Sequence, residues 1–119
     1  MIMKFLPTLF ILVLLIACNS LYDETHLLGE WQVKSWVVAS SGARVNQKMD
    51  FSFQSDKQYT VDYGSEKDSG SYYIAGEYLH AKGNNAVEIS VKITQLTKDS
   101  LSIEMNRQGQ LEKVLLLKK

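Results

Sequence analysis

The sequence predicts an all-β protein in which an eight-stranded antiparallel up-and-down barrel follows an N-terminal signal peptide. Apolar and polar residues alternate along most of the chain after residue 28, most clearly over residues 87–93, and this period of two is typical of strands with one buried face. Polar or glycine-containing turns separate the alternating segments. An apolar run over residues 5–16 stands apart from this pattern and precedes Cys18, the single cysteine of the chain.

The start of the chain has the layout of a secretory signal peptide. Lys4 supplies a positive charge, residues 5–16 form the apolar core, and Ala17 is the small residue before the cleavage position. The core is shorter than the about 20 residues that a membrane-spanning helix needs, and the polar side chain of Asn19 ends it. We therefore expect cleavage after Ala17, with an uncleaved membrane helix as the alternative.

The residues around the cleavage position resemble a bacterial lipobox, with the sequence Leu15-Ile16-Ala17-Cys18. This resemblance implies that Cys18 carries fatty acyl chains such as palmitate, and several such chains anchor a protein firmly where one does not. Asn19 stands where some inner-membrane lipoproteins have aspartate, which favours the cell outer membrane over the inner membrane. The predicted organisation is a signal peptide at 1–17, a lipidated N-terminus and short tether at 18–27, and a barrel domain at 28–119.

The first half of the barrel follows from alternating apolar residues. Residues 26–29 indicate a short helical turn, with Asp23 or Thr25 as its cap. After it we expect strands at about 30–38, 45–53, 57–63 and 70–75. The apolar residues that share one face of these strands are Trp31, Val33 and Val37, then Val45, Met49, Phe51 and Phe53, then Tyr59, Val61 and Tyr63, then Tyr72 and Ile74.

The second half repeats the pattern and suggests closure of the sheet. We expect strands at about 77–82, 87–96, 100–106 and 110–118. The connections are short, so consecutive strands are expected to be antiparallel neighbours. An open sheet would leave two unpaired edges, and closing it into a barrel removes them. Trp36 and Val38 have the opposite parity to Trp31 and are therefore expected on the outside of the barrel.

Three short motifs make the chain resemble a bacterial lipocalin-like domain. They are the Gly-x-Trp pattern of residues 28–31, the segment 51–59 that begins with Phe51 and ends at Tyr59, and the segment 69–74 around Tyr72. The resemblance implies a closed barrel that binds a small hydrophobic or amphiphilic ligand, with Gly29 and Trp31 at its closed end. Such barrels often place an arginine over this tryptophan, and here Lys118 or Lys119 would cover the ring by a cation–π contact.

Several classes of function are not expected. The 13 basic and 13 acidic residues give a formal net charge of 0, so the chain has no electrostatic basis for binding nucleic acid. His26 and His80 do not have the spacing of metal ligands. Neither a Gly-x-Ser-x-Gly motif nor a Cys–His pair with a free cysteine is present. We therefore expect no enzymatic activity, no metal and no cofactor.

The up-and-down order also predicts the open end of the barrel. The connections near Gly42, residues 64–70, residues 83–85 and residues 107–109 would lie at the end opposite Trp31. The predicted rim of this mouth, which would favour an anionic head group, consists of Arg44, Tyr63, His80, Lys82 and Arg107. The predicted lining for the apolar tail consists of Met49, Phe51, Tyr72, Ile89, Val91 and Ile103. If this rim binds the head group, replacing Arg107 with alanine should weaken the uptake of a fatty-acid probe.

The function expected from the sequence is that of a cell-envelope protein that is held to the membrane through Cys18 and binds a small hydrophobic ligand. The alternative is a non-catalytic interaction or inhibitor module, whose barrel is filled by its own side chains and presents loops to an envelope protein partner. A small barrel can be filled in this way. A continuous cavity of several hundred Å³ would favour the first function, because small-molecule sites typically measure about 300–1,000 Å³.

Overall fold

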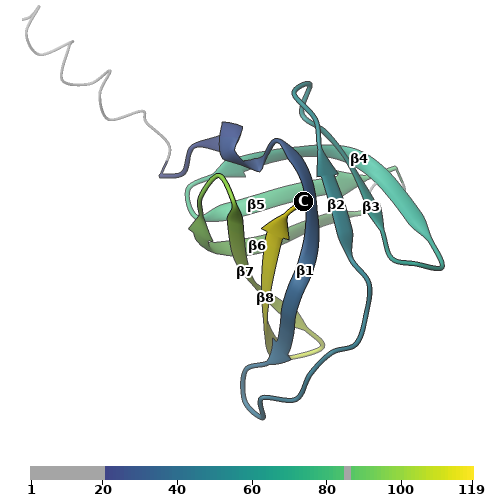
Figure 1. The fold of residues 1–119 in the computed structure, drawn as a ribbon, viewed down its shortest axis with the longest axis vertical. Coiled ribbons are helices and arrows are strands. Elements are labelled where there is room, and N and C mark those ends of the chain that lie inside the picture. The colour runs from purple at the N-terminus through teal and green to yellow at the C-terminus, as the bar shows by residue number, and fades with distance from the viewer. Residues whose placement is uncertain (1–20, 85–86) are drawn as a thin grey trace, which may run out of the picture.

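The computed structural model describes residues 21–84 and 87–119, and within them the chain forms a closed barrel of antiparallel strands (Figure 1). The predicted signal peptide and Cys18 lie outside the described residues. The strands follow one another around the barrel in chain order, and the last pairs with the first. This arrangement confirms the predicted fold class. No helix in residues 21–84 or 87–119 is long and apolar enough to cross a membrane.

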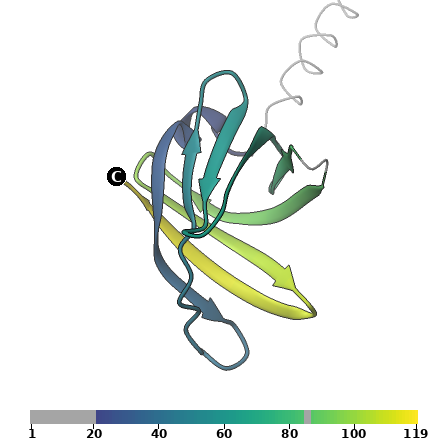
Figure 2. The same cartoon turned by 90° about the vertical axis from the view of Figure 1, so that its right-hand side faces the viewer.

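A short 3-10 helix precedes eight strands, and all the strands predicted from the sequence are present. Figures 1 and 2 show the barrel in two perpendicular views, with the strands strongly tilted and coiled about its axis. The elements are η2 (Glu24–Leu27), β1 (Gly29–Val38), β2 (Asp50–Phe53), β3 (Gln58–Asp62), β4 (Lys67–Ala75), β5 (Tyr78–Gly83), β6 (Glu88–Leu96), β7 (Ser100–Arg107) and β8 (Gln110–Lys118).

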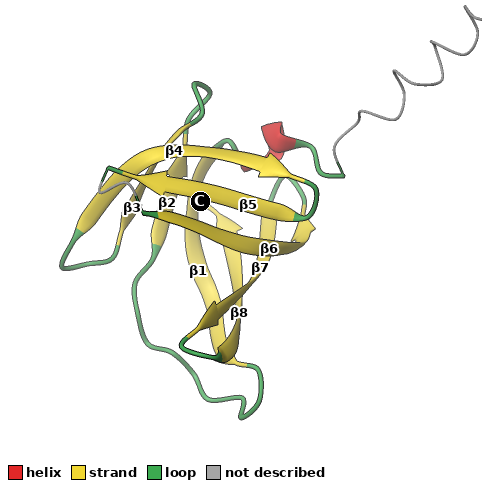
Figure 3. Cartoon of the chain, turned by 180° about the vertical axis from the view of Figure 1, so that it is seen from behind, coloured by secondary structure: helices red, strands yellow, loops and turns green. Residues whose placement is uncertain are grey.

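The second predicted strand, 45–53, is wrong over its first five residues. Only Asp50–Phe53 forms strand β2, and it pairs with β1 over residues 29–31. Arg44 makes an isolated antiparallel bridge with Val37, and the Val45 amide donates to the carbonyl of Trp36 at 2.9 Å. The polar residues 46–48 between these two pairings have low strand propensity. The long connection from β1 to β2 is visible in Figures 1 and 3.

The fourth predicted strand, 70–75, begins three residues earlier in the structure. Lys67, Asp68 and Ser69, expected in a turn, pair with Asp62, Val61 and Thr60 of β3. Pairing with the neighbouring strand thus overrides the weak strand propensity of Asp68 and Ser69.

Trp36 is buried, which corrects the prediction that it lies outside the barrel. Its side chain is only 3% exposed. The register between β1 and β8 shifts between Val33 and Ser35, which is the signature of a β-bulge. One extra residue inverts the parity of everything after it. Trp36 therefore faces the interior opposite Val114, and Val38 lies opposite the buried Glu112.

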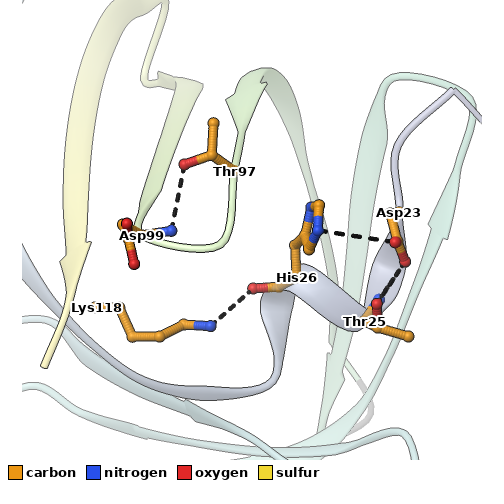
Figure 4. Close-up of polar contacts among 6 residues, drawn as sticks. All are labelled: Asp23, Thr25, His26, Thr97, Asp99 and Lys118. Carbon is orange, nitrogen blue, oxygen red and sulfur yellow. Dashed lines mark hydrogen bonds and ion pairs between the residues drawn. The ribbon is translucent and has the colours of Figure 1, made fainter.

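The end of the barrel that contains η2 is closed by Trp31 and Lys118. The Trp31 ring is fully buried, and its Nε1 donates to the carbonyl of Leu27 at 2.7 Å. Lys118 Nζ lies 5.0 Å from the centroid of this ring and donates to the carbonyl of His26 at 3.2 Å (Figure 4). Lys119 turns away and pairs with Asp50 at 3.4 Å, so Lys118 is the residue over the tryptophan.

Gly29 and Asp23 fix how the chain enters this end. Gly29 has a φ of 122°, and a Cβ there would lie 3.5 Å from Cε of Lys118. The Asp23 carboxylate accepts from the Thr25 amide at 3.0 Å and caps η2, and its contacts with the hydroxyl and amide of Thr25 lower its pKa. Figure 4 shows this cap beside the turn between β6 and β7.

Within the described residues, the core consists of inward-facing side chains from the eight strands together with Leu27 of η2 and Met49, which precedes β2. Tyr22 is the earliest residue that packs against this cluster, and its hydroxyl donates to the carbonyl of Ile93 at 3.0 Å.

Gly70 offers a test of the packing between β4 and β5. It lies opposite Gly83, and a Cβ at this position would lie 2.0 Å from the backbone oxygen of Lys82. Gly70→Ala should lower the free energy of unfolding by about 1–3 kcal/mol, the usual cost of overpacking. Urea denaturation of the variant measures this cost, with the neighbouring Ser71→Ala as the control that should stay close to the parent. A Gly70→Ala protein as stable as the parent would contradict the close approach of the two strands.

Candidate functional site

The interior of the barrel contains a small apolar cavity of about 80 Å³. Side chains of β2, β3, β5, β6 and β7, together with Met49, surround it. The stacked rings of Phe51 and Phe53, with centroids 5.4 Å apart, form one wall next to Tyr59. The complete lining is Met49, Phe51, Phe53, Tyr59, Tyr63, Leu79, Ala81, Ile89, Val91, Leu101, Ile103 and Met105.

Five of the six residues predicted to line the tail site surround this cavity: Met49, Phe51, Ile89, Val91 and Ile103. Tyr72, the sixth, is buried but does not line it. Its ring packs edge-on against Phe53 at 5.0 Å, and its hydroxyl donates to the carbonyl of Gln54 in the hairpin between β2 and β3. Tyr72 therefore fills the closed half of the barrel.

The cavity extends to the end of the barrel opposite Trp31. Ile89, one of its lining residues, is 52% exposed, and its neighbour Val87 is 56% exposed. Tyr63, a predicted rim residue, also lines the cavity. Burial and, less strongly, the nearby Asp68 carboxylate raise the pKa of Tyr63, so its phenol stays neutral and able to donate a hydrogen bond.

Arg107 is engaged with two other side chains at this end. Its Nε lies 3.3 Å from Oε1 of Glu112, and its guanidinium lies 5.3 Å from the centroid of the Trp36 ring. The Glu112 side chain is only 5% exposed, and the same Oε1 accepts a hydrogen bond from Nε1 of Trp36 at 2.8 Å. Glu112 therefore neutralises the charge that the sequence analysis assigned to the head group.

His80 and Lys82 point away from the cavity, on the outer face of β5, so they do not form the inner rim that the sequence predicted. The residues of this strand that line the cavity are Leu79, which precedes His80, and Ala81, which lies between His80 and Lys82. His80 stacks on Tyr73 with ring centroids 4.7 Å apart, and its Nδ1 lies 2.6 Å from Oγ of Ser90. This surface cluster is separated from the cavity by the sheet.

Arg44 lies at a second hollow, on the side of the barrel. This wall groove lies between residues 32–36 of β1 and residues 44–50, and its volume is about 790 Å³. Lys34 and Lys48 line it together with Arg44, and Met49 lines both the groove and the interior cavity. Of the predicted tail residues, Met49 is the one that lines this groove with Arg44.

Sequence reasoning missed Trp36, Glu112 and half of the cavity lining. A signal for Glu112 exists: it has the same parity as Val114 and Leu116 and is the one charged residue of that inward-facing series before Lys118. Charged side chains are almost never fully buried unless they are paired, so this position calls for a partner. Trp36 had no such signal, because its orientation depends on the bulge.

The described part of the chain contains no group of three or more His, Cys, Asp or Glu side chains placed to hold a metal ion. The features gathered at the hollow end are a small apolar cavity, a neutral phenol, a buried carboxylate paired with a half-exposed arginine, and a cationic groove. This combination suits the non-covalent binding of an apolar or amphiphilic molecule.

Comparison with known proteins agrees with this geometry. Residues 27–103 match the family model of the lipocalin-like domain. No protein with curated annotation shows significant sequence similarity to the chain.

Two solved structures share the fold. A lipocalin-like protein from Bacteroides uniformis has a TM-score of 0.61 and 19% identity, with 79% of this chain and 99% of that chain covered. An uncharacterized protein from Bacteroides eggerthii has a TM-score of 0.59 and 14% identity, with 78% and 99% covered. The match covers almost the whole length of both crystallised chains.

The pairing of Glu112 with Trp36 can be tested by comparing two substitutions. Glu112→Gln keeps an oxygen that accepts from the indole, whereas Glu112→Ala leaves the buried N–H of Trp36 without an acceptor. The alanine variant should be less stable than the glutamine variant by about 1–3 kcal/mol, the cost of an unsatisfied buried donor. Chemical denaturation monitored by tryptophan fluorescence measures both, and equal stabilities would show that the hydrogen bond contributes nothing.

Proposed function

Since the chain belongs to the lipocalin-like domain family, we propose that it binds a small hydrophobic or amphiphilic ligand in its barrel while lipid on Cys18 holds it at the bacterial cell envelope. Binding is non-covalent, and the proposal includes no reaction. The resemblance of residues 15–18 to a lipobox supports the anchoring. The residue after the cysteine favours the outer membrane as its location.

The observation that carries the proposal is the apolar cavity at the hollow end of the barrel. Its twelve lining residues include no charged side chain, and the only polar atoms among them are two phenols and two thioether sulfurs. A site lined by apolar side chains with a few polar groups is typical of small-molecule pockets. Such a lining selects an apolar chain or ring rather than a sugar or a nucleotide.

The size of the cavity restricts the ligand. A volume of about 80 Å³ is well below the roughly 300–1,000 Å³ of most small-molecule sites. Only the end of a single narrow chain fits without movement of the walls. Met49 and Met105 stand in the lining, and methionine is the apolar side chain that adapts most easily to a new neighbour. We therefore expect the cavity to widen around a narrow chain rather than around a broad ring system.

The same small volume favours a second candidate function, the non-catalytic interaction module. A barrel that is almost filled by its own side chains has little room for a ligand. In that case the loops at the hollow end, or the outer cluster of Tyr73, Tyr78 and His80, would contact a protein partner in the envelope.

Ala81→Leu distinguishes the two candidates, because it adds apolar volume to the cavity. If the cavity binds ligand, this variant should bind an environment-sensitive fluorescent fatty acid at least ten-fold more weakly than the parent, with little change in stability because the void accepts the added atoms. Lys82→Leu adds an apolar side chain at the next residue on the outer face and is the matched control. Undiminished uptake by a folded Ala81→Leu protein would favour the interaction module.

The proposed anchor makes a separate prediction. Cells that express the full chain in the presence of an alkyne analogue of palmitate should label the protein, and Cys18→Ser should abolish the label while the precursor keeps residues 1–17. Mass spectrometry of the purified N-terminus reads both outcomes, and fractionation assigns the labelled protein to the outer or the inner membrane. Labelling that persists in the Cys18→Ser variant would rule out this residue as the lipid attachment site.

A further inference from the structure

The wall groove exists because β1 lacks a neighbour over part of its length. β1 pairs with β2 at residues 29–31 and with Arg44 at Val37. Between these two points the described residues provide no strand pairing for residues 32–35 on this side, and the segment 46–49 passes at a distance. The hollow left between them has a volume of about 790 Å³. The bulge between Val33 and Ser35 lies at the same position, and bulges commonly mark places where strand pairing is interrupted.

Met49 separates this groove from the interior cavity. It is 4% exposed and lines both spaces, so its side chain is the partition between them. An unbranched thioether side chain changes rotamer at low cost and tolerates many packing arrangements. Displacing this one side chain would join the charged groove to the apolar cavity.

The charge of the groove is strongly biased. Lys34, Arg44 and Lys48 line it, against the single carboxylate of Asp50. Lys48 is shared between Asp50, at 4.0 Å, and Asp62, at 3.4 Å. Within residues 21–84 and 87–119, the side chains of Lys34 and Arg44 make no ion pair or hydrogen bond. Two cations therefore face the groove without a counter-charge from the described chain.

We propose that the wall groove binds the anionic head of a single-chain amphiphile, whose apolar chain passes Met49 into the barrel. Lys34 and Arg44 are the head-group residues, and the head carries a carboxylate or a phosphate. This inference rests on the proposed function, because the cavity must accept the apolar chain. It moves head-group recognition from the mouth of the barrel to its side, since Arg107 is already paired with Glu112.

The geometry favours this occupant over a free anion. A free anion would gain only the electrostatic attraction of the exposed cations, which water and salt weaken. An amphiphile gains in addition the burial of its apolar chain, about 0.8 kcal/mol for each methylene group. The groove with its charged lining and the cavity with its apolar lining therefore supply the two halves of one ligand.

The test measures binding of decanoate, decyl phosphate and decanol to the purified full-length protein by calorimetry. The double variant Lys34→Gln and Arg44→Gln should bind decanoate and decyl phosphate at least ten-fold more weakly and decanol with unchanged affinity. Lys92→Gln with Lys98→Gln removes the same charge from the other side of the barrel and should change none of the three. Inorganic phosphate should compete far more weakly than decyl phosphate.

Nuclear magnetic resonance locates the site directly. Addition of decanoate should shift backbone amide signals of residues 32–36 and 44–49 more than those of residues 107–112. Three results would each overturn the proposed groove site while leaving the proposed function intact. They are shifts confined to residues 107–112, competition by inorganic phosphate equal to that by decyl phosphate, and affinities for decanoate and decyl phosphate that the double variant does not change. Binding of none of the three probes to the parent protein would instead refute the proposed function.

Discussion

The pairing of β1 with β8 is the interaction on which the rest of the structure depends, because it closes the sheet. It extends from Trp31 opposite Lys118 to Val38 opposite Glu112, with one bulge between Val33 and Ser35. The first part of the ladder places Lys118 over Trp31 and closes one end of the barrel. Beyond the bulge the inward parity changes, so that Trp36 rather than Val37 faces the interior and meets Glu112. Closure and the bulge together therefore determine which side chains fill the barrel and where polar groups enter it.

The strands could be predicted from the sequence because a period of two is a local property, and Tyr59, Val61, Ile93 and Ile103 all lie inside as expected. The bulge could not be predicted, since Lys34 looks like any other polar residue of an alternating strand. The extra residue of the bulge arises from the pairing of β1 with a segment distant in the sequence. The predicted strand from Val45 failed for a related reason, because residues 46–48 are polar on both faces and specify no register. In β5 both faces carry apolar residues, Tyr78 on one and Leu79 with Ala81 on the other, so alternation alone did not orient His80 and Lys82.

The two ends of the barrel differ in how completely their side chains pack and form hydrogen bonds with one another. At the closed end Trp31, Leu27 and Lys118 combine apolar packing, an indole hydrogen bond and a cation over the ring. At the hollow end the cavity is bounded by side chains that are partly exposed, and the one buried carboxylate, Glu112, is held by Arg107 and Trp36. A buried carboxylate is costly unless it is paired, so this trio fixes the ends of β1, β7 and β8 around the void. The hollow end can therefore keep a cavity without losing the register of its strands.

Because β1 has no strand partner on one side over residues 32–35, this short edge has to be stabilised by other means. An unpaired strand segment of four residues is a site for unwanted pairing with another chain. In this protein the edge carries Lys34, the bulge distorts its backbone, and beyond the Val45–Trp36 hydrogen bond the segment 46–49 runs past it without strand pairing. Charge and bulging are the usual defences of an edge strand. The same two features leave the hollow beside residues 32–35 open, so the protection of the edge and the proposed entry of a ligand depend on one local irregularity.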